Sequence, residues 1–261
     1  VSGRNYYLSM NYIEGDTLEG IVERLGPFSE SRALEIVKVV AETLRYIHEK
    51  VGIFHKDIKP SNIMIDREGE IFLLDLGISQ YVGDKSRHSI LGSPYHMSPE
   101  QILGGQLDWR TDLYSLGTTL YFMLFGNPPF HKENDVGRIL ELHLKGNFPV
   151  PSDSVAGART SAGAMRLLRK MMERHAKARQ QSWKELIDDI EKLQNPGRTP
   201  AAGGVGSGIA TQSMAAPEKQ ANRPRKQALQ VISSSNMKIP LPMKKHKPLA
   251  IVDSVRHYQK N

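Results

Sequence analysis

The stretch FHKDIKPSNIMID, residues 54–66, places a dense group of polar side chains between apolar residues. It holds one histidine, two lysines, two aspartates and one asparagine. The apolar residues on either side indicate that the backbone here runs toward the interior, where polar groups are costly unless they are paired. A function for these side chains therefore has to be sought in their spacing.

The polar residues supply a carboxylate, a lysine and an amide at Asp57, Lys59 and Asn62, and Asp75-Leu76-Gly77 begins 13 residues after Asn62. Phosphoryl transfer needs such a set: a carboxylate for the attacking hydroxyl, oxygen ligands for Mg²⁺ and a cation for the phosphate. The alternative is that Asp57, Asn62 and Asp75 are only turn formers and helix caps, as Asp and Asn often are. That alternative predicts neither their spacing nor their order.

The stretch resembles the catalytic loop of a protein kinase. The resemblance implies that Asp57 orients the acceptor hydroxyl, that Asn62 and Asp75 hold Mg²⁺ or, as an alternative ion, Mn²⁺, and that Lys59 steadies the γ-phosphate of ATP. A lysine two residues after the catalytic aspartate resembles the serine/threonine pattern. His55 is expected to be structural, packing under the loop.

The resemblance continues along the chain. LGSPYHMSPEQ, residues 91–101, resembles the end of an activation segment, with Ser93 where a hydroxyl seats the acceptor residue. It also implies an internal ion pair between Glu100 and Arg179. Asp112, in the sequence DWRTDLYSLG, is expected to hydrogen-bond the backbone of the catalytic loop from below, and Gly117 to permit close packing.

The adenine pocket is implied by the sequence MNYIEGDTL, which resembles the hinge between kinase lobes. By that resemblance Met10 is the gatekeeper, the Asn11 carbonyl and Ile13 amide face adenine, and Met64 is the floor. Ser86 and Ser89 are either ordinary loop serines or regulatory phosphosites.

Hydrophobic spacing predicts a mostly helical domain with a small β element, and the resemblance implies an α+β, protein-kinase-like fold with a mainly helical C-terminal lobe. Apolar residues recur at helical spacing over 29–50, with Ser29 or Ser31 near the N-cap. NIMID and EIFLLD, joined by turn-forming residues, predict a hairpin. A buried central helix is expected over 112–125, ending at Gly126, and a last helix after a capping box of Ser182 and Glu185.

Charge and composition divide the chain near residue 196. The net charge of +7 comes from residues 196–261, which hold 11 of the 35 basic residues and only 2 of the 28 acidic ones. That segment is rich in Gly, Ala and Pro, which predicts a disordered basic tail behind a kinase domain over 1–195. Apart from Tyr258 it lacks interleaved aromatic residues, so specific nucleic-acid binding is not expected, and a solvated linker is favoured over a tether to an anionic partner.

Cysteine is absent and no apolar run approaches the roughly 20 residues of a membrane span. A cytoplasmic location is therefore expected, although a span outside the chain stays open. The expected partners are ATP and protein substrates with Ser or Thr acceptors.

Only five residues precede Tyr6, and no glycine-rich loop or V-A-I-K lysine stands among them. The resemblance thus covers the hinge and C-lobe, and we expect an N-terminally truncated serine/threonine kinase that is inactive as it stands. The alternative is a catalytically silent, pseudokinase-like lobe that acts as a protein-binding scaffold.

Overall fold

A computed structural model describes residues 12–75, 80–81, 93–149, 160–195 and 229–232 of the chain. Seven α-helices lie in these residues: α1 (Leu18–Leu25), α2 (Glu30–Tyr46), α3 (Pro99–Ile102), α4 (Arg110–Phe125), α5 (Val136–Lys145), α6 (Ala162–Met171) and α7 (Trp183–Gln194). The strands are β1 (Gly15–Thr17), β2 (Ile53–Phe54), β3 (Ile63–Asp66), β4 (Ile71–Leu74), β5 (Gln80–Tyr81) and β6 (Leu229–Ile232). A π-helical turn, Ile47–Val51, continues α2, and short 3₁₀ turns occupy Pro60–Asn62, Pro94–His96 and Ala176–Ala178.

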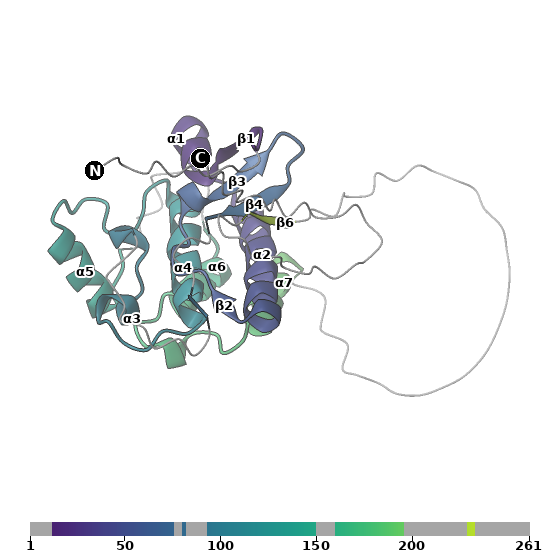
Figure 1. Ribbon diagram of the computed structural model, residues 1–261. Coiled ribbons are helices and arrows are strands. Elements are labelled where there is room, and N and C mark those ends of the chain that lie inside the picture. Colours follow the sequence, from purple (N-terminus) through teal and green to yellow (C-terminus); the bar gives the residue numbers. More distant parts are fainter. Residues whose placement is uncertain (1–11, 76–79, 82–92, 150–159, 196–228, 233–261) are drawn as a thin grey trace, which may run out of the picture.

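The core lies between α2, α4, α6 and α7 (Figure 1). Helix α4 is its centre, since every residue from 111 to 124 is buried. It ends at Gly126, whose φ of 78° is left-handed and favours glycine. The prediction of a buried central helix with this end is confirmed, and the helix begins two residues earlier than expected.

Serine residues begin two of the helices, as the sequence predicts. The Ser29 hydroxyl accepts from the Arg32 N–H at the start of α2, and the Ser182 hydroxyl accepts from the Glu185 N–H at the start of α7. The expected capping box is only half formed, because the Glu185 carboxylate accepts from the Gln181 N–H and pairs with Lys170.

A four-stranded sheet, in the order β1-β3-β4-β6, covers one end of the helices (Figure 1). The predicted hairpin is confirmed: β3 and β4 are antiparallel, with Ile63 opposite Leu73. Strand β1 pairs with β3, and β2 forms a separate small ladder with β5.

Strand β6 corrects the prediction of disorder throughout 196–261. Residues 229–232 pair in parallel with β4 and lie near α2. The sequence of β6, LQVI, is a short apolar patch of the tail, and the edge of β4 offers it a ladder of hydrogen bonds. The domain boundary at residue 196 stays a prediction.

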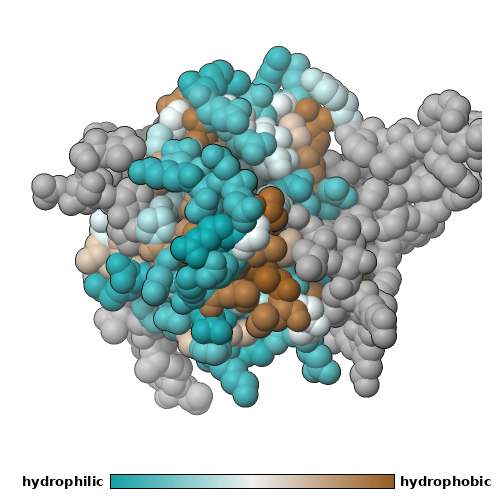
Figure 2. Space-filling model, turned by 90° about the vertical axis from the view of Figure 1, so that its left-hand side faces the viewer, coloured by the Kyte–Doolittle hydropathy of each residue, from teal (hydrophilic) through white to brown (hydrophobic). Residues whose placement is uncertain are grey.

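Tyr12 and Ile13, which precede β1, are not in a strand. Within the part of the chain that the structure describes, no helix has the length and apolar character to cross a membrane. The face on the α5 side is mainly hydrophilic, and hydrophobic residues show near its centre and toward its upper edge (Figure 2).

Candidate active site

The Asp57 carboxylate is held by two neighbours in its own loop. Its Oδ2 lies 2.8 Å from Lys59 Nζ and accepts from Asn62 Nδ2 at 3.1 Å. The same Asn62 nitrogen also donates to the Asp57 carbonyl at 2.9 Å. The three residues predicted to be catalytic are therefore brought together around one oxygen.

The backbone just before Asp57 is held from below by Asp112. The two carboxylate oxygens of Asp112 accept from the His55 N–H at 2.6 Å and the Lys56 N–H at 2.7 Å. Lys56 has a φ of 70°, which costs energy in a residue with a side chain. Burial raises the pKa of Asp112 to about 7, although its bonds to His55 and Lys56 act in the other direction.

His55 connects the loop to the end of β4. Its fully buried ring places Nε2 2.9 Å from the carbonyl oxygen of Leu74. A carbonyl can only accept, so Nε2 carries the proton and Nδ1 is left to accept from the Asp57 N–H at 3.4 Å. Burial lowers the pKa of His55 below its usual range, which favours this neutral form.

Asn62 and Asp75 lie at the same end of the hairpin. Asn62 directly precedes β3 and Asp75 directly follows β4, and the register that pairs Ile63 with Leu73 brings the two ends together. Asp75 is exposed and has a φ of 61°, so the chain turns there. The Asn62 nitrogen faces Asp57, and amide and carboxylate oxygens, such as those of Asn62 and Asp75, are ligands of the kind that Mg²⁺ prefers.

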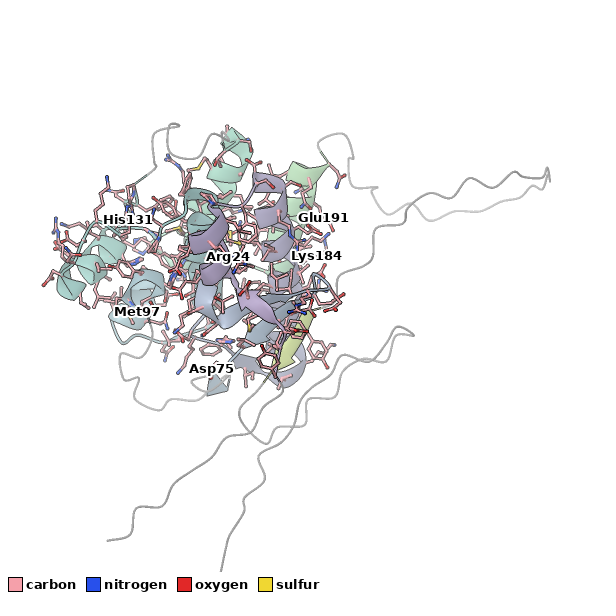
Figure 3. The ribbon with its side chains drawn as sticks, turned by 90° about the horizontal axis from the view of Figure 1, so that it is seen from above. Arg24, Asp75, Met97, His131, Lys184 and Glu191 are labelled. Carbon is pink, nitrogen blue, oxygen red and sulfur yellow. The ribbon has the colours of Figure 1, made fainter. Side chains whose placement is uncertain are left out.

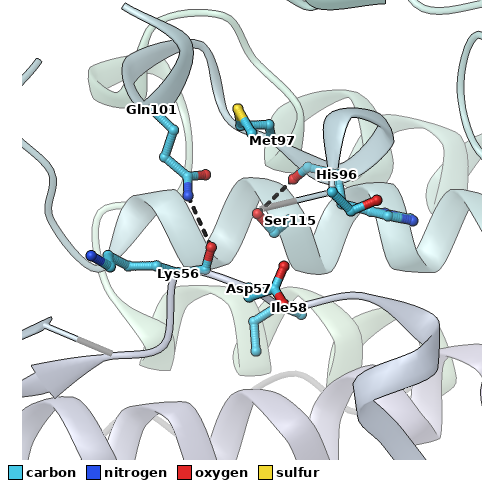
Figure 4. Close-up of a pocket in the computed structure, with 8 residues that line it drawn as sticks. Lys56, Asp57, Ile58, His96, Met97, Gln101 and Ser115 are labelled. Carbon is cyan, nitrogen blue, oxygen red and sulfur yellow. Dashed lines mark hydrogen bonds between the residues drawn. The ribbon is translucent and has the colours of Figure 1, made fainter. Parts of the chain in front are cut away.

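A pocket beside Asp57 joins the catalytic loop to the segment that precedes α3 (Figure 4). Its lining residues are Lys56, Asp57, Ile58, Ser93, His96, Met97, Gln101 and Ser115. Ser93, predicted to seat the acceptor residue, thus lies in the same group of lining residues as Asp57. Viewed from above, Met97 and Asp75 lie away from Lys184 and Glu191 of α7 (Figure 3).

Helix α3 is anchored by Glu100 and Arg179. Two guanidinium nitrogens of Arg179 meet the two Glu100 oxygens at 2.7 and 2.8 Å, and the Arg179 side chain is fully buried. Arg179 also donates to the carbonyls of Arg110, Glu173 and Arg174. The Thr111 hydroxyl donates to Glu100, so the buried charges are well partnered.

The structure describes only part of the predicted adenine pocket. Ile13 is partly buried just before β1, and Met64 is partly buried within β3. Met64 pairs with Thr17 of β1 on one side and Phe72 of β4 on the other. Met10 and Asn11 lie outside the described residues, as do Ser86 and Ser89.

Sequence reasoning did not single out Gln101, His96 or Ser115 as parts of this pocket. For Gln101 a signal was present, since Ser98 followed three residues later by Gln is the pattern of a capping box. The structure contains that box in full.

Comparison with known proteins gives one family. The protein kinase domain matches residues 1–189. The chain is 36% identical over 191 residues to a "Probable serine/threonine-protein kinase" of Clostridium perfringens, a match that covers 72% of this chain and 27% of the relative. It is 32% identical over 201 residues to the serine/threonine-protein kinase PknB of Mycobacterium tuberculosis, covering 75% of this chain and 31% of PknB.

The chain therefore spans less than a third of the length of these curated relatives. The family match extends over most of the chain and includes the loop around Asp57, the hairpin and α4. This chain belongs to the protein kinase family, and the relatives it matches are serine/threonine kinases of bacteria.

Proposed function

We propose that the protein transfers the γ-phosphate of ATP to Ser or Thr hydroxyls of protein substrates. The observation that carries this proposal is the arrangement of Asp57, whose carboxylate is fixed by Lys59 and Asn62 and lines the same pocket as Ser93. A hydroxyl that approaches the Asp57 carboxylate would meet a positioned proton acceptor with the Lys59 cation beside it.

In the proposed step the acceptor oxygen forms a bond to the γ-phosphorus while the bond between that phosphorus and the leaving ADP oxygen breaks. The hydroxyl proton passes to Asp57. Lys59 offsets negative charge on the phosphoryl oxygens, and Asn62 and Asp75 would hold Mg²⁺. The ion, when bound, would neutralise charge on the phosphates of ATP.

Adenine is assigned to the wall formed by Ile13 and Met64, together with Met10 and Asn11. The proposed location is the cytoplasm, where ATP and protein substrates are available. The pocket residue Ser93 is assigned to seating the acceptor, which would order the substrate next to Asp57.

Asp57→Asn in the full product of the gene tests the role of Asp57. The substitution keeps the side-chain volume but removes the proton acceptor, so phosphotransfer to a generic Ser/Thr substrate should fall by at least about 100-fold. Asp66→Asn is the matched control: Asp66 lies in the same stretch and accepts from the Glu68 and Glu70 N–H groups, a structural role that Asn can partly keep. Near wild-type transfer by the Asp57→Asn protein would refute the assignment.

We further propose that transfer needs the phosphate grip of a smaller lobe, because the 261 residues supply no lysine in a V-A-I-K setting. Parallel assays of the 261-residue chain and of the full gene product test this. Activity in the full product alone supports the proposal. Robust activity in the 261-residue chain contradicts it, and inactivity of both favours the protein-binding scaffold.

A further inference from the structure

We propose that Gln101 is a positioning residue that fixes the peptide bond directly before Asp57, an inference that rests on the proposed kinase function. Gln101 belongs to α3, far in sequence from the catalytic loop, and its side chain is buried. Its Nε2 donates to the Lys56 carbonyl at 2.9 Å, as the dashed line in Figure 4 shows.

The carbonyl that Gln101 binds belongs to the Lys56–Asp57 peptide bond. The N–H of the same peptide faces His55 Nδ1, and the Lys56 N–H donates to Asp112. Gln101 therefore holds the carbonyl side of this peptide bond, whereas its N–H side faces His55. The Gln101 contact comes from α3, an element that contains neither His55 nor Asp112. Rotation of this peptide would move Asp57, since Asp57 is the next residue.

The conformation of Lys56 makes this contact consequential. Its φ of 70° is unfavourable for a residue with a side chain and persists only where surrounding contacts hold it. Loss of the Gln101 bond would remove one of these contacts and leave a partly buried carbonyl short of a donor.

The other end of the Gln101 amide is also used. Oε1 accepts from the Ser98 N–H at 3.0 Å, and the Gln101 N–H donates to the Ser98 hydroxyl. Ser98 precedes α3 and follows the Ser93 segment, and Glu100, the residue just before Gln101 in α3, is tied to Arg179. Gln101 thus connects the segment that seats the acceptor with the loop that carries Asp57.

Gln101→Glu isolates the donor function. Glutamate has the same shape and can still accept from the Ser98 N–H, but its ionised carboxylate cannot donate to the Lys56 carbonyl. Gln106→Glu is the matched control, because Gln106 is exposed and the change in charge is the same.

Two readouts apply. In the full gene product, Gln101→Glu should lower kcat roughly ten- to 100-fold with little change in the KM for ATP, since a misplaced group costs rate rather than nucleotide binding. In the 261-residue chain, hydrogen exchange should quicken at the Lys56 and Asp57 amides while the α4 amides keep their protection. Gln106→Glu should change neither.

An unchanged kcat together with unchanged exchange at Lys56 and Asp57 would overturn the inference and leave the kinase proposal standing. Faster exchange throughout the chain, with a lower Tm, would also overturn it, because Gln101 would then be merely structural. If the wild-type gene product transfers no phosphate, the kinase proposal fails. Hydrogen exchange at the Lys56 and Asp57 amides then remains the test of whether Gln101 fixes the peptide bond before Asp57.

Discussion

At the scale of single residues, the site depends on buried charges that are held by several partners each. Arg179 is fully buried, donates to Glu100 and three carbonyls, and lies 4.8 Å from the centre of the Tyr114 ring. Removal of one partner of such a pair leaves the other charge buried without compensation. The anchoring of α3 should therefore be sensitive to either residue.

We predict that Glu100→Gln or Arg179→Met lowers the free energy of unfolding by roughly 3–5 kcal/mol, because each strands the partner's charge. The double variant should cost less than the sum of the two. Urea unfolding of the four proteins in a double-mutant cycle measures the coupling.

The exposed pair of Lys38 and Glu191, 2.5 Å apart, is the control for that cycle. Its charges remain hydrated, so the coupling there should be at most about 1 kcal/mol. Equal coupling energies in the two cycles would show that burial does not strengthen the Glu100–Arg179 pair.

At the scale of elements, the contact between α4 and α6 depends on Gly117. A Cβ atom at this position would lie 2.9 Å from Met172 Cγ and 3.0 Å from Met171 Cβ. The Met172 side chain can rotate away, but Met171 Cβ moves only with its backbone. The two helices therefore approach each other at a distance that favours glycine, since any other residue would require Met171 or Met172 to shift.

We predict that Gly117→Ala lowers the free energy of unfolding by about 1–2 kcal/mol, since the steric cost exceeds the gain of alanine in a helix. Gly20→Ala in α1 is the control, as its Cβ would meet only Thr17 Oγ1 at 3.5 Å. That change should be neutral or stabilising by up to about 1 kcal/mol. Thermal unfolding of both variants checks the difference in sign.

The elements that the sequence predicts well are those with a local cause. Periodic apolar residues and a capping serine are enough to predict α2 and α7, and two β-rich runs around a turn predict the hairpin. Strand β6 could not be predicted, because four residues acquire a strand conformation only through pairing with a distant edge.

The same distinction holds for the site. The types and spacing of Asp57, Lys59 and Asn62 are visible in one short stretch, and the structure brings them together. The positive φ of Lys56 and its bond to Gln101 are not visible there, because tertiary contacts impose them.

At the scale of the whole molecule, buried titratable groups make stability depend on pH. Burial, with smaller effects of His143 and Lys59, lowers the pKa of His96 to about 3, and burial lowers that of His143 to about 4. Their ring nitrogens bond to the hydroxyls of Thr118 and Tyr114. Both histidines are therefore neutral in the folded protein at pH values where an unfolded histidine is protonated.

The direction in which stability changes with pH follows from which state, folded or unfolded, binds more protons. Below about pH 6.5, His96 and His143 bind protons in the unfolded state but stay neutral in the folded state. As pH falls toward 4, each of these two histidines therefore lowers the free energy of unfolding by up to about 1.4 kcal/mol per pH unit. Asp112 acts oppositely: its raised pKa stabilises the fold at low pH, and that contribution is lost as pH rises toward 7. His55, whose pKa burial also lowers, acts in the same direction as His96 and His143, so three buried histidines against one aspartate give a net loss of stability in acid.

We predict that His143→Gln, which cannot titrate, flattens the fall in the free energy of unfolding between pH 6.5 and about 4. His131→Gln is the control, because His131 is exposed. Urea unfolding at several pH values measures the slopes, and identical slopes for His143→Gln and wild type would contradict the prediction.

The parallel pairing of β4 with β6 has a consequence for synthesis of the chain on the ribosome. Ile71 pairs with Leu229, so 158 residues separate the two partners. At roughly 5–20 residues per second, the ribosome needs about 8–30 s to make that intervening length. During this interval the hairpin and α2 are already made, but the outer edge of β4 has no partner strand from its own chain. Neighbouring nascent chains on the same messenger RNA would then compete for that edge, which makes crowded translation the condition under which this protein should misassemble most.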